Sequence, residues 1–324
     1  MSKYLVTGIA GFIGSNIARE LVRRGETVRG IDNFASGKWE NIAELKDDLE
    51  FREVSLLDPK GLESACEGVD FVLHQAALPS VPKSVADPMG TNAVNVNGTL
   101  NLLVAARDAK VNRVVYAASS SAYGETEVLP KREDMLPRPI SPYAVQKLTG
   151  EYYLQAFWSV YGLETVSLRY FNIFGPRQDA NSLYSAVLAK FITQMFQGES
   201  PTIFGDGEQS RDFAYVANAV KANLLACVAP VEDVCGKVFN IATGNRYSLN
   251  QTYRMLQEIT GFTGAPRFAE ERVGDVRHSL ADISLAQKCL GYTPDVSFQE
   301  GLRLTVEWYR QLTQQNATAA AIAS

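Results

Sequence analysis

The stretch "VTGIAGFIG" (residues 6–14) decides the fold class of this chain. It follows a short β-branched run at 3–7 and leads into a helix-period segment at 12–24, which predicts a strand, a tight turn and a helix. Glycines at 8, 11 and 14 let backbone N–H groups approach a pyrophosphate at the positive end of the helix dipole. An ordinary strand-to-helix turn is the alternative interpretation, because a glycine trio alone is a weak signal.

Asp32 favours the dinucleotide interpretation. It ends the next predicted strand, "TVRGID" (27–32), about 20 residues after the glycines. A carboxylate there can accept hydrogen bonds from the adenosine ribose hydroxyls and would repel a 2′-phosphate. The two features together predict NAD rather than NADP, although a strand-end cap is the simpler alternative for Asp32 alone.

The rest of the chain extends the same alternation of strands and helices. Because buried apolar strands separated by helices are typical of parallel sheets, the pattern predicts an α/β fold with a Rossmann-type doubly wound sheet. Further strands are expected at 71–74, 113–119 and 165–171, and helices at 88–109, 143–161, 184–197, 215–228, 248–259 and 298–312. We expect a nucleotide-binding domain at 1–175, a smaller α/β lobe at 176–315 with possible returns to the first domain, and a frayed end at 316–324.

Composition excludes several classes of function. The 324 residues are 46% hydrophobic and 21% charged, as in ordinary globular proteins. A net charge of −5 with scattered lysines and arginines argues against a nucleic-acid partner. The strand-like start and the lack of a long apolar run predict a cytoplasmic protein without a membrane partner.

The cysteines and histidines limit the available chemistry. Four widely spaced cysteines form no C-x-x-C pair, so we expect neither a disulfide framework nor a metal site. Two histidines make a His-rich metal centre or a Ser-His-Asp triad hard to build. Any proton transfer must therefore use another group.

Two further motifs could supply that group. "YAASSSAYG" (116–124) places three serines at the carboxyl end of a predicted strand, where parallel sheets bind their ligands. "SPYAVQK" (141–147) places Tyr143 and Lys147 four residues apart, on one face of a helix. Taken singly, a serine-rich turn, a core aromatic and a solvated lysine are simpler interpretations. Their order after the glycines and Asp32 favours one shared cofactor crevice.

These segments resemble the extended short-chain dehydrogenase/reductase family, and within it the nucleotide-sugar 4-epimerases, especially those of UDP-N-acetylglucosamine. The resemblance covers nearly the whole chain. It rests on "TGIAGFIG", "IDNFASG", "HQAALPSVPKS", "NVNGTLNLL", "ASSSAYG", "SPYAVQK", "LRYFNIFGPRQD", "GDGEQSRDF" and "RVGDVRHSLAD".

The resemblance implies a catalytic set of Ser119, Tyr143 and Lys147. Tyr143 would take the proton from a sugar C4 hydroxyl while hydride moves to NAD, with Ser119 holding the oxygen and Lys147 favouring the phenolate. Decarboxylases of the family tend to carry an acidic residue at the position of Ser121, and dehydratases need an acid/base pair there. Without either, return of the hydride to the other face of a 4-keto sugar is the expected outcome.

The resemblance also implies two sets of binding residues. The cofactor set is Gly8, Gly11, Phe12, Ile13, Gly14, Asp32, Asn33, Ser36, Gly37, Ser55, Leu56, Gln75, Ala76, Ala77, Asn95, Tyr143, Lys147 and Phe171, with Ser55 in place of the family's usual aspartate. The substrate set is Ser80, Ser119, Ser120, Ser121, Tyr143, Asn172, Arg211, Arg272, Asp275 and Ser279. Arg211 and Arg272 would grip the UDP pyrophosphate, and Asp275 the uridine ribose.

Ser279 bears on the choice of sugar. Family members restricted to UDP-glucose and UDP-galactose tend to carry a tyrosine four residues after the aspartate at 275, so a serine favours UDP-GlcNAc and UDP-GalNAc. UDP-glucose 4-epimerase and UDP-glucuronate 4-epimerase are the enzymatic alternatives, and an NAD-binding scaffold or redox sensor is the non-enzymatic one. By analogy with the family, we expect a homodimer formed through the helices at 88–109 and 143–161.

Overall fold

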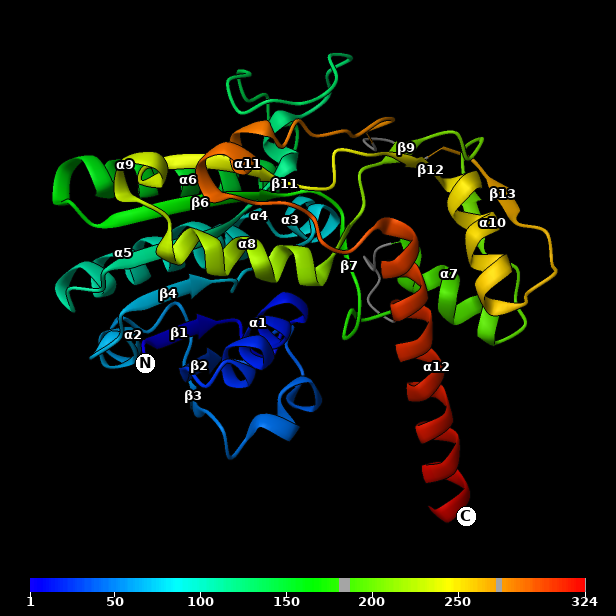
Figure 1. Ribbon diagram of the computed structural model, residues 1–324, viewed down its shortest axis with the longest axis horizontal. Helices are drawn as coiled ribbons and strands as arrows, with labels where there is room; N and C mark the ends of the chain where they lie inside the picture. The colour runs from blue at the N-terminus through cyan, green and yellow to red at the C-terminus, as the bar shows by residue number, and fades with distance from the viewer. Residues whose placement is uncertain (181–186, 272–275, 324) are drawn as a thin grey trace.

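A seven-stranded sheet forms the centre of the computed structural model, which describes residues 1–180, 187–271 and 276–323 (Figure 1). All of its neighbouring strands pair in parallel. The strands follow the order β11 (Lys237–Ile241), β6 (Glu164–Tyr170), β5 (Arg113–Ser119), β4 (Phe71–His74), β1 (Lys3–Thr7), β2 (Thr27–Asp32) and β3 (Glu50–Glu53).

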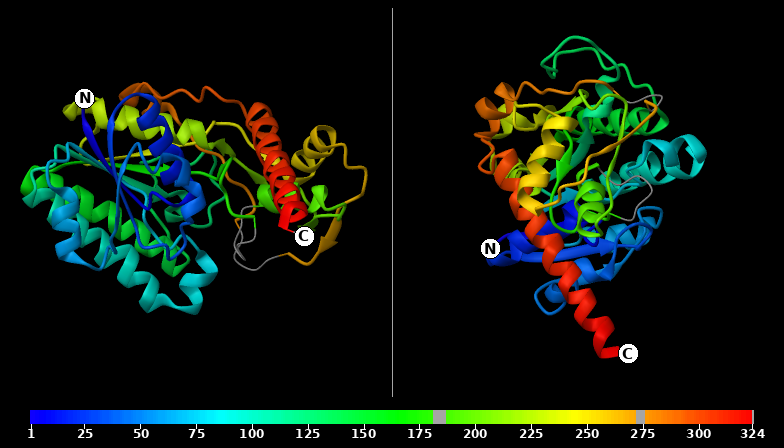
Figure 2. Two further views of the ribbon diagram at one scale, coloured as in Figure 1. Left: turned by 90° about the horizontal axis from the view of Figure 1, so that it is seen from below. Right: turned by 90° about the vertical axis from the view of Figure 1, so that its right-hand side faces the viewer.

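Helices cover both faces of the sheet, which explains why its inner strands are apolar along their length (Figures 1 and 2). One core packs under α1 (Phe12–Arg23) and α8 (Val216–Val228), which contact each other. A second core lies under α2 (Pro59–Cys66), α5 (Gly98–Asp108) and α6 (Pro142–Tyr161). The predicted doubly wound fold is confirmed.

The helix predicted at 88–109 is interrupted. The chain forms α3 (Val81–Ala86) and α4 (Pro88–Asn92), then a π-helical turn, η3 (Ala93–Asn97), before α5 begins at Gly98. Asn95, which is buried, lies in this turn. Such π-turns occur frequently at functional sites.

The smaller lobe lies beyond one end of the sheet (Figure 2). Its helices are α7 (Val187–Phe196), α10 (Leu249–Thr260) and α12 (Phe298–Ala323). Short strands pair as β8 (Thr202–Phe204) with β13 (Arg267–Ala269), β9 (Ser210–Arg211) with β12 (Tyr247–Ser248), and β7 (Ile173–Phe174) with β10 (Ala214–Tyr215). Helices α9 (Val231–Val234) and α11 (Ser284–Leu290) contact each other and pack beside β6 and β11 of the large sheet. Short 3₁₀ turns are η1 (Trp39–Asn41), η2 (Ala43–Leu45) and η4 (Ser120–Tyr123).

Two features of the later chain differ from a simple division at residue 175. Strand β11 returns to the large sheet and pairs with β6, so the first domain includes sequence from the second half of the chain. Helix α12 spans Phe298–Ala323, and the frayed end expected at 316–324 stays a prediction. Alanine is the strongest helix former, which favours continuing a helix that packing has already started.

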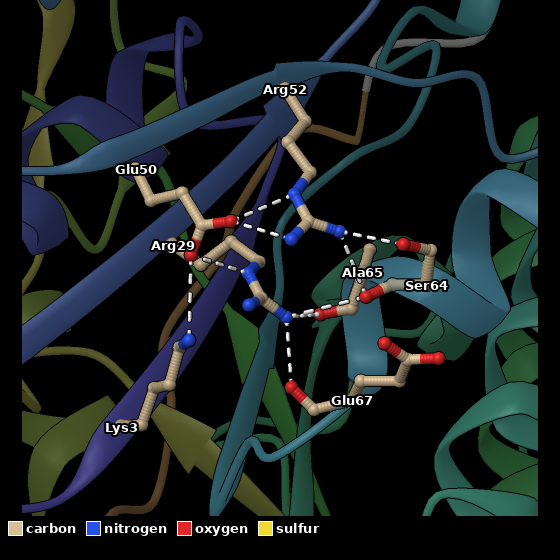
Figure 3. A network of polar contacts seen from close by, with 7 residues as sticks. All are labelled: Lys3, Arg29, Glu50, Arg52, Ser64, Ala65 and Glu67. Carbon is tan, nitrogen blue, oxygen red and sulfur yellow. Dashed lines mark hydrogen bonds and ion pairs between the residues drawn. The ribbon is translucent and has the colours of Figure 1, made fainter.

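A polar network closes the end of the sheet where β1, β2 and β3 begin (Figure 3). Arg29 is buried, and its guanidinium donates to the carbonyl oxygens of Ala65 (2.7 Å) and Glu67 (2.9 Å) at the end of α2 and to Glu50 Oε2 (2.9 Å). Burial would raise the pKa of Glu50, but hydrogen bonds from Arg29 and Arg52 lower it to about 2. The network joins three strands to a helix C-terminus, where a cation is favoured.

Three features of the described part of the chain bear on its chemistry. No helix there is long and apolar enough to cross a membrane. No group of three metal-ligating side chains is found among the same residues. The four cysteines are all described and are free thiols, three of them buried.

Candidate active site

The turn between β1 and α1 is a close-packed backbone crossing that leads into the N-terminus of α1. Gly8 has φ +66°, and a Cβ on it would lie 2.8 Å from the backbone of Ala76. A Cβ on Gly14 would clash with Gly8 O, and Gly11, the N-cap of α1, has no side chain to cover the helix end. Phe12 and Ile13 pack against the core beneath. The turn therefore fits the pyrophosphate of a dinucleotide.

Asp32 ends β2 with its carboxylate beside this turn. Oδ2 accepts the N–H of Ala10 (2.9 Å) and Oδ1 the N–H of Phe34 (2.8 Å). Burial raises the pKa of Asp32, while these backbone hydrogen bonds act in the opposite direction. A Cβ on Gly37 would lie 2.8 Å from Oδ2, so glycine there leaves the carboxylate open. The arrangement fits the adenosine ribose.

The remaining residues expected near the adenosine lie around this carboxylate and after β3. Asn33 Oδ1 accepts the N–H of Ala35 (3.2 Å), and Ser36 is exposed. Ser55 Oγ accepts the N–H of Leu57 (3.2 Å), so its hydroxyl hydrogen is still available to a ligand. Leu56 is buried against Gly98 of α5, which leaves it a packing role.

The loop after β4 is held by amide side chains. Gln75 Oε1 accepts from Tyr170 Oη (3.2 Å), and Gln75 Nε2 donates to Asn223 Oδ1 (3.0 Å). Asn95 Oδ1 accepts the N–H of Leu78 (2.8 Å), while its Nδ2 donates to Leu78 O and to Gln146 Oε1. Asn95 thus positions the loop that carries Ala76 and Ala77, because its amide is already fully bonded within the protein.

Ser119, Tyr143 and Lys147 meet at the carboxyl end of β5. Ser119 Oγ is 2.8 Å from Ser121 Oγ, which donates to it. Tyr143 lies in the first turn of α6, and its N–H donates to Ser84 Oγ (3.0 Å). Lys147 is buried, and its Nζ donates to Ala117 O (2.8 Å). Lys147 Nζ also lies 4.8 Å from the ring centroid of Tyr116, a cation–π distance.

Burial controls the charge of these groups in the protein alone. It raises the pKa of Tyr143 to about 12, while a hydrogen bond with Ser119 acts in the opposite direction. It lowers the pKa of Lys147 to about 7, although the Glu151 carboxylate opposes this. Desolvation therefore has the largest effect on the pKa of both Tyr143 and Lys147 in the protein by itself.

An ion pair behind Lys147 was not predicted. Glu151 lies one helical turn after Lys147, and both of its carboxylate oxygens accept from Arg169 (2.9 and 2.7 Å). Both side chains are almost fully buried. The spacing of Glu151 from Lys147 was a visible signal, but Arg169 comes from β6, so its partner could not be identified from local sequence.

The expected substrate residues lie in three places. Ser80 caps α3 by accepting the N–H of Lys83 (3.0 Å), and Ser120 follows Ser119 in η4. Asn172 donates to Asp212 O (3.1 Å). Phe171, which is expected to contact the cofactor, is fully buried in the apolar core, where its ring packs against Tyr123.

A pocket in the smaller lobe is lined by two of the expected substrate residues, Asn172 and Arg211. Arg211 donates from Nη1 to Ser210 O (3.1 Å) and Arg277 O (3.0 Å). Ser279 is buried, and its N–H donates to Ser210 O (3.0 Å), which places it beside the strand that carries Arg211. Arg272 and Asp275 lie outside the described residues. The pocket lining comprises Asn172, Ile173, Phe174, Val187, Leu188, Thr202, Phe204, Gln209, Arg211, Phe213 and Leu249.

Comparison with known families agrees with this geometry. Residues 4–242 match the model of the NAD dependent epimerase/dehydratase family. The chain belongs to this family. The expected family, the Rossmann-type fold and NAD as cofactor are thereby confirmed. The homologues include UDP-sugar 4-epimerases, and also two UDP-sugar decarboxylases at 31% identity.

Three solved structures show how this family member relates to others. A UDP-N-acetylglucosamine 4-epimerase from Methanobrevibacter ruminantium, in complex with UDP-N-acetylmuramic acid, is 42% identical, with a TM-score of 0.92 and coverage of 96% of this chain and 99% of that one. A UDP-glucose 4-epimerase from Thermotoga maritima with UDP-glucose is 41% identical, with a TM-score of 0.91 and the same coverage. A UDP-glucuronic acid 4-epimerase from Bacillus cereus, with UDP-glucuronic acid and NAD, is 33% identical, with a TM-score of 0.88 and coverage of 96% and 99%.

His74 supports the glycine turn of this epimerase/dehydratase from within the core. Its Nδ1 is 2.8 Å from Thr7 Oγ1, directly before Gly8, and its Nε2 is 3.0 Å from Thr99 Oγ1. Burial lowers the pKa of His74 to about 3, and the charge of Lys147 acts in the same direction.

We expect His74 to make the fold sensitive to acid. The unfolded chain binds a proton on His74 below about pH 6.5, whereas the folded protein resists it down to about pH 3. Folding stability therefore falls as the pH drops through this window, by up to about 1.4 kcal/mol per pH unit. In His74→Gln, the loss of unfolding free energy between pH 6.5 and 5, measured with urea, should be about 1.5 kcal/mol smaller than in wild type. If His74→Gln loses as much unfolding free energy as the wild type over this pH range, His74 is not the cause of the acid sensitivity.

Proposed function

We propose that this enzyme interconverts UDP-N-acetylglucosamine and UDP-N-acetylgalactosamine by NAD-dependent epimerisation at C4. Ser279 is the observation that carries the choice of sugar: it is small, buried and bonded to the backbone next to Arg211. In the enzymes that the sequence resembles, a tyrosine at this position accompanies restriction to UDP-glucose and UDP-galactose. A serine leaves the space of an aromatic ring for a 2-acetamido group.

Tyr143 is the proposed acid/base. Its phenol oxygen takes the proton from the C4 hydroxyl and later returns it, while Ser119 holds the same oxygen by a hydrogen bond. When bound, NAD supplies the hydride acceptor and a positively charged ring beside this site. Since burial raises the pKa of Tyr143 to about 12 in the protein alone, the phenol needs added positive charge to act as a base at neutral pH.

Lys147 is the chain's own contribution to that charge. Its ammonium is held by Ala117 O and the face of Tyr116, and the Glu151–Arg169 pair lies behind it. The carboxylate of Glu151 favours the charged form of Lys147 against the effect of burial. Lys147 is therefore proposed both to orient the cofactor ribose and to support the phenolate.

The pocket of the smaller lobe is the proposed site of the nucleotide. A guanidinium such as that of Arg211 matches phosphate oxygens through its planar donors. Arg272 and Asp275 remain proposals for the pyrophosphate and the uridine ribose. Ser80, Ser120, Ser121 and Asn172 are the other proposed substrate contacts.

UDP-glucose and UDP-glucuronate are the alternative sugars. A small residue at 279 admits the larger acetamido group but does not exclude a 2-hydroxyl. The similarity to a UDP-glucose 4-epimerase is as high as that to a UDP-N-acetylglucosamine 4-epimerase, at 41% and 42% identity, so sequence similarity does not separate these substrates.

Product analysis tests the reaction itself. The purified enzyme is incubated with UDP-GlcNAc, and the anomeric proton signals are followed by NMR. We expect UDP-GalNAc to form, and the same equilibrium mixture to result from either sugar. A dehydrated, decarboxylated or stable 4-keto product, or no conversion of any UDP-sugar, would contradict the proposed reaction.

The assembly is a further part of this proposal. Helix α6 exposes Val145, Tyr152 and Val160, which recur at intervals of seven and eight residues along one side of the helix. Val85 and Met89, on the neighbouring α3 and α4, are also exposed. We propose that two copies of the chain bury these residues in a homodimer. Light scattering should give the mass of a dimer.

A further inference from the structure

Lys131 lies in the extended segment between η4 and α6 and is buried. Its N–H donates to Leu280 O (2.8 Å), and its carbonyl oxygen accepts the N–H of Asp282 (2.9 Å). The backbone of Lys131 is therefore bonded to residues 279–282, which we call the Ser279 segment.

The side chain of Lys131 extends to a different part of the site. Its Nζ donates to Gly124 O (2.9 Å) and lies 5.8 Å from the ring centroid of Tyr123. Gly124 ends the serine loop (residues 119–124), has φ +63°, and would clash with Arg138 O if it carried a Cβ. Lys131 thus links the serine loop to the Ser279 segment.

A second link joins the same two segments. Tyr123 Oη donates to Asn240 Oδ1 (2.7 Å), and Asn240 Nδ2 donates to Lys131 O (3.0 Å) and Asp282 O (3.1 Å). Tyr123 and Asn240 are both buried. The hydrogen bonds form a closed ring, so neither segment can shift without breaking one of them.

The charge of Lys131 is costly where it lies. Within the described residues its ammonium has no carboxylate as a hydrogen-bond or ion-pair partner, and a cation buried in this way loses its hydration. Burial and the nearby Arg211 both lower its pKa. An apolar residue would be easier to bury at this position. The presence of a lysine is therefore explained by the hydrogen bond that its ammonium donates to Gly124 O, which an apolar side chain could not make.

We propose that Lys131 is a positioning residue of the sugar site, which holds the serine loop at a set distance from the Ser279 segment. This inference rests on the proposed function, because those two segments are the walls assigned to the sugar. Lys131 does not need to contact the substrate. It sets how tightly the site closes on the sugar, and it has no part in binding the uridine diphosphate.

Binding constants test this role without turnover. In NAD-loaded protein that also carries Tyr143→Phe, dissociation constants are measured by calorimetry for UDP-GlcNAc, UDP-glucose and UDP. Lys131→Met, which keeps the length of the side chain, should weaken binding of the wild-type's preferred UDP-sugar by roughly fivefold or more. UDP should bind within about twofold of its original affinity, because it lacks the sugar.

Two further variants sharpen the result. Arg132→Met removes the neighbouring cation, which is exposed and paired with Asp134, and should change neither constant. Tyr123→Phe removes only the hydroxyl of the second link. Like Lys131→Met, it should weaken binding of the UDP-sugar. In the double variant Lys131→Met/Tyr123→Phe, the fold loss in affinity for the UDP-sugar should be smaller than the product of the two single losses. Both substitutions break the same closed ring of hydrogen bonds.

Several results would overturn the inference. Equal weakening of UDP and UDP-sugar by Lys131→Met would place its effect at the diphosphate or on the whole fold. Unchanged sugar binding in a folded, NAD-loaded variant would remove the role altogether. If Lys131→Met does not fold, unchanged sugar binding in Tyr123→Phe is the contradicting result. Each test compares the affinity for a UDP-sugar with the affinity for UDP. An error in the proposed sugar preference would instead be seen in the Tyr143→Phe protein without further changes, as tighter binding of UDP-glucose than of UDP-GlcNAc.

Discussion

Replacing Tyr143 with phenylalanine should lower kcat for UDP-GlcNAc by about a thousandfold and leave NAD bound. The change removes one hydroxyl from a side chain that lies beside Ser119, at the carboxyl end of β5. The backbone of Tyr143 stays fixed by Ser84 Oγ, so the first turn of α6 should keep its place.

Among the described residues, neither His74 nor Lys147 is placed to replace the lost hydroxyl. His74 is buried, with its pKa lowered to about 3, and is bonded to two threonines. Lys147 is bonded to Ala117 O and packs over Tyr116. A large loss in kcat is therefore expected from the removal of a single acid/base group.

Tyr161→Phe is the matched control for this experiment. Tyr161 lies on the same helix, is 53% exposed and is outside the proposed dimer surface, so the same chemical change should leave kcat within about twofold. Bound NAD is quantified by absorbance after denaturation in both variants. If Tyr143→Phe keeps more than about a tenth of wild-type kcat, Tyr143 is not the base.

Replacing Ser279 with tyrosine should lower kcat/KM for UDP-GlcNAc by about a hundredfold, with a much smaller loss for UDP-glucose. Ser279 is 8% exposed and bonded through its N–H to Ser210, so a large side chain there has to occupy space next to the strand of Arg211. That space is the one assigned to the acetamido group. The smaller sugar does not need it.

The control for Ser279→Tyr is Ser279→Ala, which keeps the volume small and removes the hydroxyl. It should leave the ratio of kcat/KM for the two sugars nearly unchanged. Equal losses for both sugars in Ser279→Tyr, together with weaker binding of UDP, would mean that the tyrosine disturbs the lobe as a whole. Residue 279 would then have no role in choosing the sugar.

The parts of the site that could be predicted are those made by short, contiguous stretches. The glycine turn and Asp32 depend on local backbone conformation and on the strand ends of a parallel sheet, and the structure brings them together as expected. Tyr143 and Lys147 could be placed on one helix face for the same reason.

The parts that could not be predicted depend on contacts distant in sequence. Arg169 reaches Glu151 from a strand. A return to the first domain was expected as possible, but local sequence did not show that β11 makes it by pairing with β6. Asn95 stays a predicted cofactor residue, and its hydrogen bonds to Leu78 and Gln146 could not be identified from local sequence. Burial, which raises the pKa of Tyr143 to about 12, is likewise a property of the folded core.

The ratio of kcat/KM for UDP-GlcNAc to that for UDP-glucose tests the central claim most directly. Both are measured with the wild-type enzyme by NMR, with UDP-glucuronate as a third substrate. If an open space beside Ser279 is used by the acetamido group, UDP-GlcNAc should be favoured by about tenfold or more. A rate with UDP-glucose or UDP-glucuronate far above that with UDP-GlcNAc would contradict the account.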